Sequence, residues 1–582
     1  MSASREPQSA RSIVRPSRLA SIAAGSALVL TVGGLAAAVG QADVVTPRST
    51  PALPSRAAQA ARQAARQAAG PTPVAPKVTE MPVAPVAATK FPANVARTAP
   101  DQRGSELVAH VRARVHQASV VGVTWSRGTA PDGLVVQVRA LRSGSWSDWK
   151  DVHVDPGEGP SADEETTVRD GTEPIWIGAA ESVEVAAYSP DKTVPQQMRL
   201  QAIDPGTAPY DTAPPSQTTT ATTTASKAGA FPAMPNIVTR SQWGADESLG
   251  DRCWAPRLGS AFKMVFVHHT VGSNTYSRSE SAAVVRGIYA YHTESRGWCD
   301  IGYNFLVDRY GTVFEGRGGG IRQPVRGAHA GDYNTDTTGI SLMGNFETGY
   351  PTAAMKSSLV RLIAWRMGTA YRNAYGGAIV EGSWFRRISG HRDAMSTACP
   401  GEHVYSWLPR LRERVADQLG SYQSKIEQEW VDRGGPKSSW GPVRIGEQHE
   451  HHGGHTTFDG GRMYRFDHET LAFRRGPVLT RFVRSGEIDG DLGYPVSETR
   501  TPRNGEAADF EHGSIYWSIS SRSHILKSSA IMKRYRALGG ATSDLAFPTS
   551  PVLTTTSGAK ANFQHGTITF DKSSKRLTVT YE

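Results

Sequence analysis

The stretch Lys263-Met-Val-Phe-Val-His-His-Thr270 carries four apolar residues in succession and then two adjacent histidines. A short apolar run that contains Val and Phe is typical of a strand buried on both faces. Because side chains alternate along a strand, His268 shares a face with Met264 and Phe266, whereas His269 points to the opposite face. The strand therefore places one imidazole at the end of an otherwise apolar face.

The segments around this strand alternate between helical and extended patterns. Apolar residues three and four apart predict a helix over residues 279–291 and another from Thr352 onward. The remaining expected elements are strands at 304–307, 312–315 and 339–343 and a helix at 402–419, with a hairpin turn at Asp308-Arg-Tyr-Gly311. Residues 236–420 are therefore expected to form an α/β domain, in which helices pack on a mixed sheet.

The N-terminal segment has the pattern of a secretory signal peptide. Four arginines within the first 18 residues precede an apolar stretch at residues 19–39, and Gly40-Gln-Ala42 follows. Small residues at those positions predict cleavage after Ala42, so residues 1–42 are assigned to a signal peptide. The alternative is an uncleaved membrane anchor, since about 21 residues can span a bilayer. We expect a secreted protein with no lasting membrane anchor.

Composition divides the region between the signal peptide and the α/β domain. Residues 43–100 are rich in Ala, Pro, Gln and Arg and are expected to be a disordered linker. Residues 101–203 contain alternating runs separated by turn residues, which predicts a small all-β domain. Residues 204–235 are rich in Thr, Ser, Ala and Pro and are assigned to a second linker.

The last 160 residues repeat with a period close to 52. Trp430, Phe482 and Tyr535 are 52 and 53 residues apart, and Phe458, Phe510 and Phe563 have the same spacing. Three registered copies predict a tandem array over residues 421–582. The copies resemble the LGFP repeats of actinobacterial wall proteins, and this resemblance implies that the array binds a cell-wall polymer.

The positive net charge does not indicate a nucleic-acid partner. The chain has 64 Lys and Arg against 54 Asp and Glu, a net charge of +10. Residues 1–100 hold 11 basic and 3 acidic residues, which is +8, so the other 482 residues carry only +2. Without a basic stripe in the folded domains, we expect no nucleic-acid binding.

The α/β domain contains a candidate metal-ligand set. His391 and Cys399 lie eight residues apart in Gly390-His-Arg-Asp-Ala-Met-Ser-Thr-Ala-Cys-Pro400, between two predicted helices. With His268 they provide two imidazoles and one thiolate, which are ligands that Zn²⁺ favours. Three protein ligands leave a fourth position open, as in catalytic zinc sites. Spacing alone also allows ordinary core histidines.

Local sequence motifs strengthen the zinc interpretation. Six of them occur in one order: Ile237-Val-Thr-Arg-Ser-Gln-Trp-Gly-Ala245, Phe266-Val-His-His-Thr270, Gly297-Trp-Cys-Asp-Ile-Gly-Tyr-Asn-Phe305, Phe314-Glu-Gly-Arg317, Gly327-Ala-His-Ala330 and the segment from His391 to Pro400. Together they resemble the peptidoglycan-recognition-protein family, which includes zinc-dependent type 2 N-acetylmuramoyl-L-alanine amidases. The resemblance covers about a third of the chain. It implies a mixed sheet with helices, a peptidoglycan groove and cleavage of the amide between N-acetylmuramic acid and L-alanine.

The resemblance also assigns individual residues. It assigns His268, His391 and Cys399 as metal ligands. Tyr303 falls at the position of the family's catalytic tyrosine, and Thr397 falls at the position just before Ala-Cys-Pro. Both hydroxyls are expected to stabilise the developing oxyanion. The positions that line the family's groove are Tyr291, His292, Arg317, His329 and Asn334. For each of these five, support of the fold is nearly as good an interpretation as ligand contact.

Two cysteines remain once Cys399 is assigned to the metal. In an exported chain, Cys253 and Cys299 are expected to form a disulfide. The alternative is a pair of free thiols, which an oxidising compartment disfavours.

Three functions compete at this point. The first is a secreted, cell-wall-associated zinc amidase. The second is a non-catalytic peptidoglycan-recognition protein, which members of the family become when the cysteine ligand is lost. The third is a thiol hydrolase with Cys399 as nucleophile. The presence of Cys399, both histidines and Tyr303 favours the first.

Overall fold

The computed structural model describes residues 73–86, 106–154, 159–161, 168–212, 232–250, 255–420, 424–450, 453–466 and 469–582. The signal peptide predicted at 1–42 lies outside these residues. Among the residues just given, no helix is both long enough and apolar enough to span a bilayer.

The N-terminal part is an all-β sheet, as predicted, with the strand order β1-β9-β3-β8-β4-β5. Its strands are β1 (Lys77–Pro82), β2 (Ala84–Pro85), β3 (Glu106–Trp125), β4 (Val135–Arg142), β5 (Ser145–Trp146), β6 (Lys150–Val152), β7 (Asp170–Gly171), β8 (Ile175–Ser189) and β9 (Arg199–Asp204). The two longest, β3 and β8, pair antiparallel and supply most of a core that includes the fully buried Val121, Val123 and Val183. Val121 and Val123 face this core, whereas Val120 just before them packs in a different apolar cluster, so this part of the sheet is buried on both faces.

The sheet begins earlier than composition indicates. Strands β1 and β2 lie inside the range 43–100, which was expected to be a linker, and they pair with β9 and β3. Val83, between the two strands, is buried in the core of the sheet. A few apolar residues in Pro-rich sequence are therefore enough to add a strand when an open sheet edge is available.

The central domain is built on a six-stranded mixed sheet, which confirms the predicted fold class. The strands are β10 (Ile237–Val238), β11 (Met264–His269), β12 (Phe305–Val307), β13 (Val313–Glu315), β14 (Thr337–Leu342) and β17 (Ile388–Gly390), in the order β10-β13-β12-β14-β11-β17. Only β12 and β13 pair antiparallel, through the predicted hairpin; the other neighbours are parallel. A separate hairpin, β15 (Gly377–Val380) and β16 (Ser383–Arg386), was not predicted.

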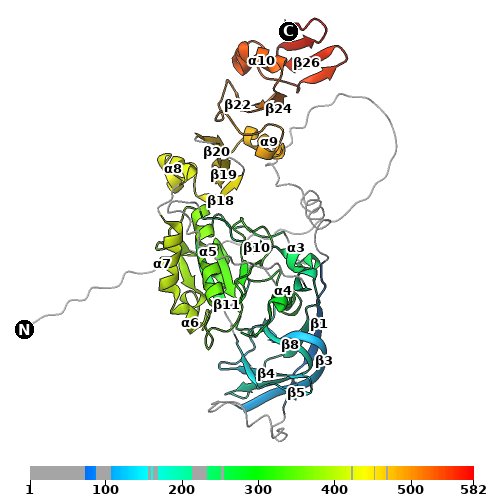
Figure 1. Cartoon of the computed structure of the whole chain (residues 1–582), viewed down its shortest axis with the longest axis vertical. Coiled ribbons are helices and arrows are strands. Elements are labelled where there is room, and N and C mark those ends of the chain that lie inside the picture. Colours follow the sequence, from blue (N-terminus) through cyan, green and yellow to red (C-terminus); the bar gives the residue numbers. More distant parts are fainter. Residues whose placement is uncertain are drawn as a thin grey trace, which may run out of the picture. The chain divides into compact units, whose positions relative to one another are not determined.

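Helices cover both faces of this sheet (Figure 1). The helices are α3 (Arg240–Trp243), α4 (Ser281–Ala290), α5 (Ala353–Thr369), α6 (Glu402–Tyr405) and α7 (Leu408–Leu419). Val265 and Val267 of β11 pack on α5 and α7, whereas Met264 and Phe266 lie in a different cluster with Phe385. The alternation predicted for this strand is therefore present, and it sends His268 away from α5.

Two helices show how local signals set the boundaries. Thr352 caps α5, and its hydroxyl accepts a hydrogen bond from the Met355 backbone N–H at 3.1 Å. The helix predicted at 402–419 is instead divided into α6 and α7 around Ser406 and Trp407. Proline at the start of α7 explains this break, because its ring is favoured in a first turn and disfavoured in a helix interior.

The N-terminal sheet and the mixed sheet share a core. Val120, Trp176 and Ile203 of the first pack with residues of α4 in one apolar cluster. Arg286 on α4 is fully buried and donates to the carbonyl oxygens of Pro205, Gly206 and Trp243, at 2.9, 3.1 and 2.7 Å. It also pairs with Asp211 of α2 (Pro209–Thr212). Buried charge is tolerated only with such partners, so this arginine joins the two domains.

The C-terminal region forms three small antiparallel sheets, each preceded by a helix (Figure 1). The elements are α8 (Lys425–Asp432) with β18 (Val443–Glu450), β19 (Gly453–Phe458), β20 (Gly461–Phe466) and β21 (Glu469–Arg474); α9 (Pro477–Arg484) with β22 (Gly505–Phe510), β23 (Gly513–Ser518) and β24 (Arg522–Lys527); and α10 (Ala530–Ala537) with β25 (Leu553–Thr555), β26 (Gly558–Phe563), β27 (Gly566–Asp571) and β28 (Leu577–Tyr581). The three aromatic pairs picked out by the 52-residue period are in contact. The ring centroids lie 5.6 Å apart for Trp430 and Phe458, 4.4 Å for Phe482 and Phe510, and 4.5 Å for Tyr535 and Phe563.

Neighbouring repeats share their cores. Helix α9 packs against Tyr464 and Phe473 of the preceding sheet and also against Phe510 and Ile515 of its own sheet. Helix α10 does the same with Tyr516 and Leu526 on one side and Phe563 and Ile568 on the other. Each helix therefore closes a core between two successive sheets, as expected for a tandem array.

The first repeat contains a carboxyl pair that makes its stability depend on pH. Burial, and after it the nearby Glu447, raise the pKa of Glu427 to about 7. A raised carboxyl pKa means that the folded state binds the proton of Glu427 more tightly than the unfolded state does. Protonation therefore stabilises the folded state. This stabilisation is fully present below the ordinary glutamate pKa and is lost as pH rises through about 7. We expect Glu427→Gln to reduce the fall in melting temperature between pH 5 and pH 8.

The control is Glu469→Gln, which removes an exposed carboxyl from β21 of the same repeat. Melting curves of the three proteins at both pH values make the comparison. Identical pH dependence of all three would show that Glu427 does not titrate in this range.

Candidate metal centre

Two neighbouring strands and one loop bring together His268, His391 and Cys399. His268 lies near the end of β11, and His391 directly follows β17, the parallel neighbour of β11. The register pairs Val267 with Gly390, so the two histidines occupy successive, adjacent positions. Cys399 comes from the loop before α6. One ligand atom from each of the three residues lies within 4.8 Å of the others, and all three residues are buried.

The contacts within this cluster are close. Cys399 Sγ lies 3.6 Å from His268 Nδ1, and the ring centroids of His268 and His391 lie 4.6 Å apart. The backbone N–H of His269 donates to Cys399 Sγ at 3.4 Å. A hydrogen bond to sulfur favours its thiolate form, which is the form that binds metal.

The electrostatic environment keeps the first imidazole neutral. Burial lowers the pKa of His268 well below its ordinary value, and the neighbouring His391 lowers it further. A neutral imidazole has a lone pair on one ring nitrogen, which is what a metal ligand requires. The cluster therefore has the donor atoms and the spacing of a metal site, and His268 is in the neutral form that such a site requires.

His329 lies behind His268. Its Nδ1 is 3.1 Å from His268 Nε2, and burial lowers the pKa of His329 to about 3. A Cβ at Gly339 of β14 would lie 2.4 Å from the His329 ring, so this approach requires glycine there. His329, expected in the substrate groove, is thus placed to orient a candidate metal ligand.

The two predicted catalytic hydroxyls also lie at the cluster. The ring centroid of Tyr303, just before β12, is 5.5 Å from that of His268, and the residue is fully buried. Thr397 accepts a hydrogen bond from the Cys399 backbone N–H at its Oγ1, at 3.1 Å. Their catalytic roles stay predictions, but both lie beside predicted ligands.

Two predicted groove residues hold the N-terminal sheet. The Tyr291 hydroxyl lies 2.8 Å from the Thr172 carbonyl oxygen and 3.1 Å from that of Val123. Asn334 donates to the Gly159 carbonyl oxygen at 2.9 Å and accepts from the backbone N–H of His329 at 2.8 Å. Both side chains are fully buried. These contacts support the fold, and ligand binding by the two residues stays a prediction.

The other two predicted groove residues, His292 and Arg317, are also buried. His292 stacks on Trp298 with ring centroids 4.3 Å apart and accepts from the Gly302 N–H at 3.2 Å. Burial lowers the pKa of His292, and Arg296 and Arg317 lower it further. The Arg317 backbone N–H donates to the Tyr303 carbonyl oxygen at 2.8 Å.

Sequence reasoning missed several contributors. Met395 Sδ lies 3.3 Å from His391 Nε2, and no spacing rule identifies a thioether in that loop. The contacts of Tyr291 and Asn334 with the N-terminal sheet span more than 100 residues of sequence, so no local pattern predicts them. The predicted Cys253–Cys299 disulfide stays a prediction because Cys253 lies outside the described residues.

Comparisons with known proteins match the part of the chain that contains this cluster. The family model described as N-acetylmuramoyl-L-alanine amidase matches residues 258–402. The chain is 35% identical over 170 residues to peptidoglycan-recognition protein SC2 of Drosophila simulans, and the match covers 29% of this chain and 83% of that relative. The chain belongs to the peptidoglycan-recognition protein family.

Further members of this family match the same part of the chain. Identity to peptidoglycan recognition protein 1 of Bos taurus is 34% over 178 residues, which cover 30% of this chain and 84% of that protein. Among solved structures, wild-type PGRP-LB of Drosophila is 27% identical and covers 33% of this chain and 98% of its own, with a TM-score of 0.25.

Two other family models match outside this domain. The model described as Rv3811 N-terminal galactose-binding domain-like matches residues 64–224, which includes β1 and β2. The LGFP repeat model matches residues 492–543 and so confirms the resemblance noted for the array.

Proposed function

We propose that this protein is a zinc-dependent hydrolase that cleaves the amide between N-acetylmuramic acid and L-alanine in peptidoglycan. The observation that carries the proposal is the buried His268, His391 and Cys399 cluster, within the residues that match the amidase model. We assign the hydrolase to residues 236–420. A recognition protein without activity would not need this complete ligand set.

The donor set fits zinc. Two imidazoles and a thiolate are borderline and soft ligands of the kind that zinc takes in tetrahedral sites, and three of them leave a fourth position for water or substrate. When bound, zinc supplies Lewis acidity, which polarises a substrate carbonyl and makes water more acidic. His268, His391 and Cys399 would hold it.

Neighbouring residues determine which ring nitrogen of His268 is available to bind a metal ion. His268 Nδ1 faces Cys399 Sγ, the other candidate ligand atom, so Nδ1 is the nitrogen that would bind the metal through its lone pair. The ring proton of the neutral imidazole is then on Nε2. That proton is then donated to Nδ1 of His329, whose low pKa keeps it neutral and able to accept. His329 thus acts as a positioning residue.

Tyr303 and Thr397 contribute hydroxyl groups next to this centre. The carbonyl oxygen of the scissile amide becomes negatively charged when water adds to the carbonyl carbon. A donor fixed beforehand stabilises that charge without reorganising. The Tyr303 hydroxyl is proposed as this donor, with Thr397 assisting, because both lie beside the predicted ligands.

Cys399→Ser tests the metal assignment. Replacing sulfur by a hydroxyl removes the thiolate ligand, so zinc content and hydrolysis of a muramyl peptide are both expected to fall sharply. Peptide binding is expected to persist, because other segments supply the groove. Zinc analysis, turnover and binding titration are the measurements. Near-normal turnover by the variant would refute the zinc assignment.

Chelation of the unmodified protein provides the control. Loss of activity that added Zn²⁺ restores is the expected result. Activity that survives chelation but is blocked by thiol alkylation would identify Cys399 as a nucleophile instead.

Tyr303→Phe tests the oxyanion donor. The ring contacts with His268 and His292 remain, so fold and zinc content are expected to be unchanged. Loss of one such donor typically lowers turnover by about 10²–10³. Steady-state rates at full zinc occupancy measure this. An unchanged rate would show that Tyr303 is structural.

We further propose that residues 421–582 hold a secreted enzyme at the cell wall and take no part in hydrolysis. The match to the LGFP repeat supports this role. A second, weak wall contact raises the effective concentration of substrate around the catalytic domain. The alternative is a spacer that binds nothing.

A chain ending at Gly420 distinguishes these alternatives. It is expected to hydrolyse soluble muramyl peptide at the full-length rate but to be lost from insoluble wall on washing. Co-sedimentation with wall and rates on both substrates are measured. Retention equal to that of the full-length protein would contradict the tethering role.

A further inference from the structure

A cleft lies between the N-terminal sheet and the loops of the hydrolase domain. Its volume is about 420 Å³, within the range of roughly 300–1,000 Å³ that is typical of small-ligand sites. Arg142 of β4, Lys150 of β6 and Trp176 of β8 line it from one side. The segment from Ser273 to Glu280, together with Arg309, lines it from the other.

The cleft carries an excess of positive charge. Arg142, Lys150 and Arg309 form no ion pair with any carboxylate in the described part of the chain. One acidic side chain, Glu280, lines the cleft, and its carboxylate accepts a hydrogen bond from the Ser277 backbone N–H at 2.6 Å. Three cations thus face one cleft with a single carboxylate.

The basic groups are close enough to affect one another. Burial lowers the pKa of Lys150, and the charge of Arg142 lowers it further. Gly178 has φ +69°, and a Cβ there would lie 3.1 Å from an Arg142 guanidinium nitrogen, so the guanidinium lies against the backbone. Like charges held together repel, and a bound anion relieves that repulsion.

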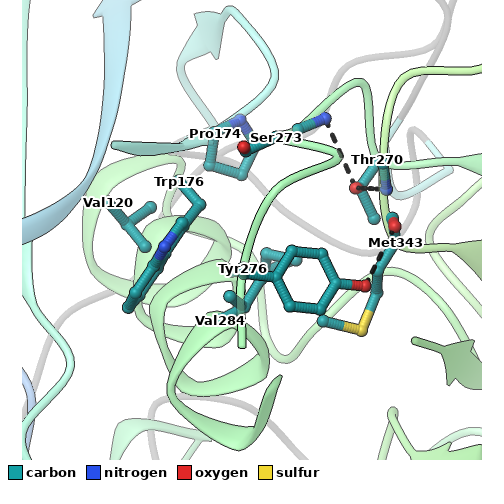
Figure 2. Close-up of a pocket in the computed structure, with 11 residues that line it drawn as sticks. Val120, Pro174, Trp176, Thr270, Ser273, Tyr276, Val284 and Met343 are labelled. Carbon is teal, nitrogen blue, oxygen red and sulfur yellow. Dashed lines mark hydrogen bonds between the residues drawn. The ribbon is translucent and has the colours of Figure 1, made fainter. Parts of the chain in front are cut away.

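Hydrogen bonds fix Tyr276 on the hydrolase side of the cleft. The Tyr276 hydroxyl donates to the Met343 carbonyl oxygen at 3.1 Å and accepts from the Arg309 backbone N–H at 2.8 Å. Figure 2 shows Tyr276 near Trp176 in a smaller adjoining cavity that Thr270 also lines. Thr270 directly follows β11, so the cleft begins close to the strand that carries His268.

Hydroxyl groups complete the lining. Ser273, Thr275 and Ser277 lie along the hydrolase wall of the cleft. Such side chains donate and accept hydrogen bonds, as the hydroxyl groups of a sugar require, while the cations match a carboxylate or a phosphate. We propose that this cleft binds an acidic saccharide, a sugar that bears a carboxylate or a phosphate group. The proposal concerns binding alone and does not depend on hydrolysis.

Calorimetric titration of the full chain tests the proposal. The probes are N-acetylmuramic acid, with a carboxylate, N-acetylglucosamine 6-phosphate, with a phosphate, and neutral N-acetylglucosamine. At least one acidic sugar is expected to bind at least tenfold more tightly than the neutral one, and added salt is expected to weaken it. The tighter of the two acidic probes identifies the charged group. Equal affinity for all three sugars, or no binding by either acidic one, would overturn the proposal.

Variants locate the binding in this cleft. Arg142→Ala and Lys150→Ala each remove one exposed cation and are expected to lower affinity about tenfold. Lys150→Arg is expected to retain it. The matched control is Arg114→Ala, which removes an exposed arginine from β3 of the same sheet outside the cleft.

Two further results would contradict the proposal. One is equal loss of affinity in the Arg114 control, which would indicate a nonspecific charge effect. The other is binding of inorganic phosphate as tightly as of the sugar phosphate, which would indicate a simple anion site. Melting temperatures confirm that each variant is folded.

Discussion

The geometry of the candidate metal centre depends on the hydrogen bonding of β11 along both of its edges. Parallel pairing with β14 and β17 fixes the register of the strand, and a shift of one residue would exchange the faces of His268 and His269. The apolar residues on each face make such a shift costly, because α5 packs on Val265 and Val267. The position of His268 is therefore set by the burial of its neighbours, and a strand paired on both edges holds it more precisely than a loop would.

The interface between the N-terminal sheet and the mixed sheet is also fixed by buried contacts, here between residues far apart in the sequence. Arg286 is buried with four polar partners, and the Tyr291 hydroxyl contacts two carbonyl oxygens of the N-terminal sheet. Polar groups in an apolar interface specify one arrangement, since any other leaves them without partners. The two sheets thus form one structural unit, although they match separate family models.

The features that sequence predicted are those with a local or periodic signal. Alternation along β11, the Asp308–Gly311 turn and the 52-residue aromatic spacing each correspond to contacts in the structure. The break before α7 had a visible cause in Pro409, but the apolar periodicity on both sides obscured it. Strands β1 and β2 were missed because their composition is that of a linker and their partners are distant. The hydrogen bonds of Tyr291 and Asn334 depend on how the two domains pack against each other. No sequence pattern near either residue predicts that packing.

The sharing of cores between successive repeats has an evolutionary consequence. A helix and the sheet that follows it form a complete module. The helix of each module packs on the sheet of the preceding module, and the sheet of each module is covered by the helix of the next one. Duplication of one period of 52 or 53 residues therefore inserts a module without leaving an apolar surface uncovered. Insertion of half a period would leave a helix or a sheet without its partner. The array can accordingly lengthen or shorten in evolution only in whole modules, and its length changes in discrete steps while the domain with the mixed sheet stays unaltered.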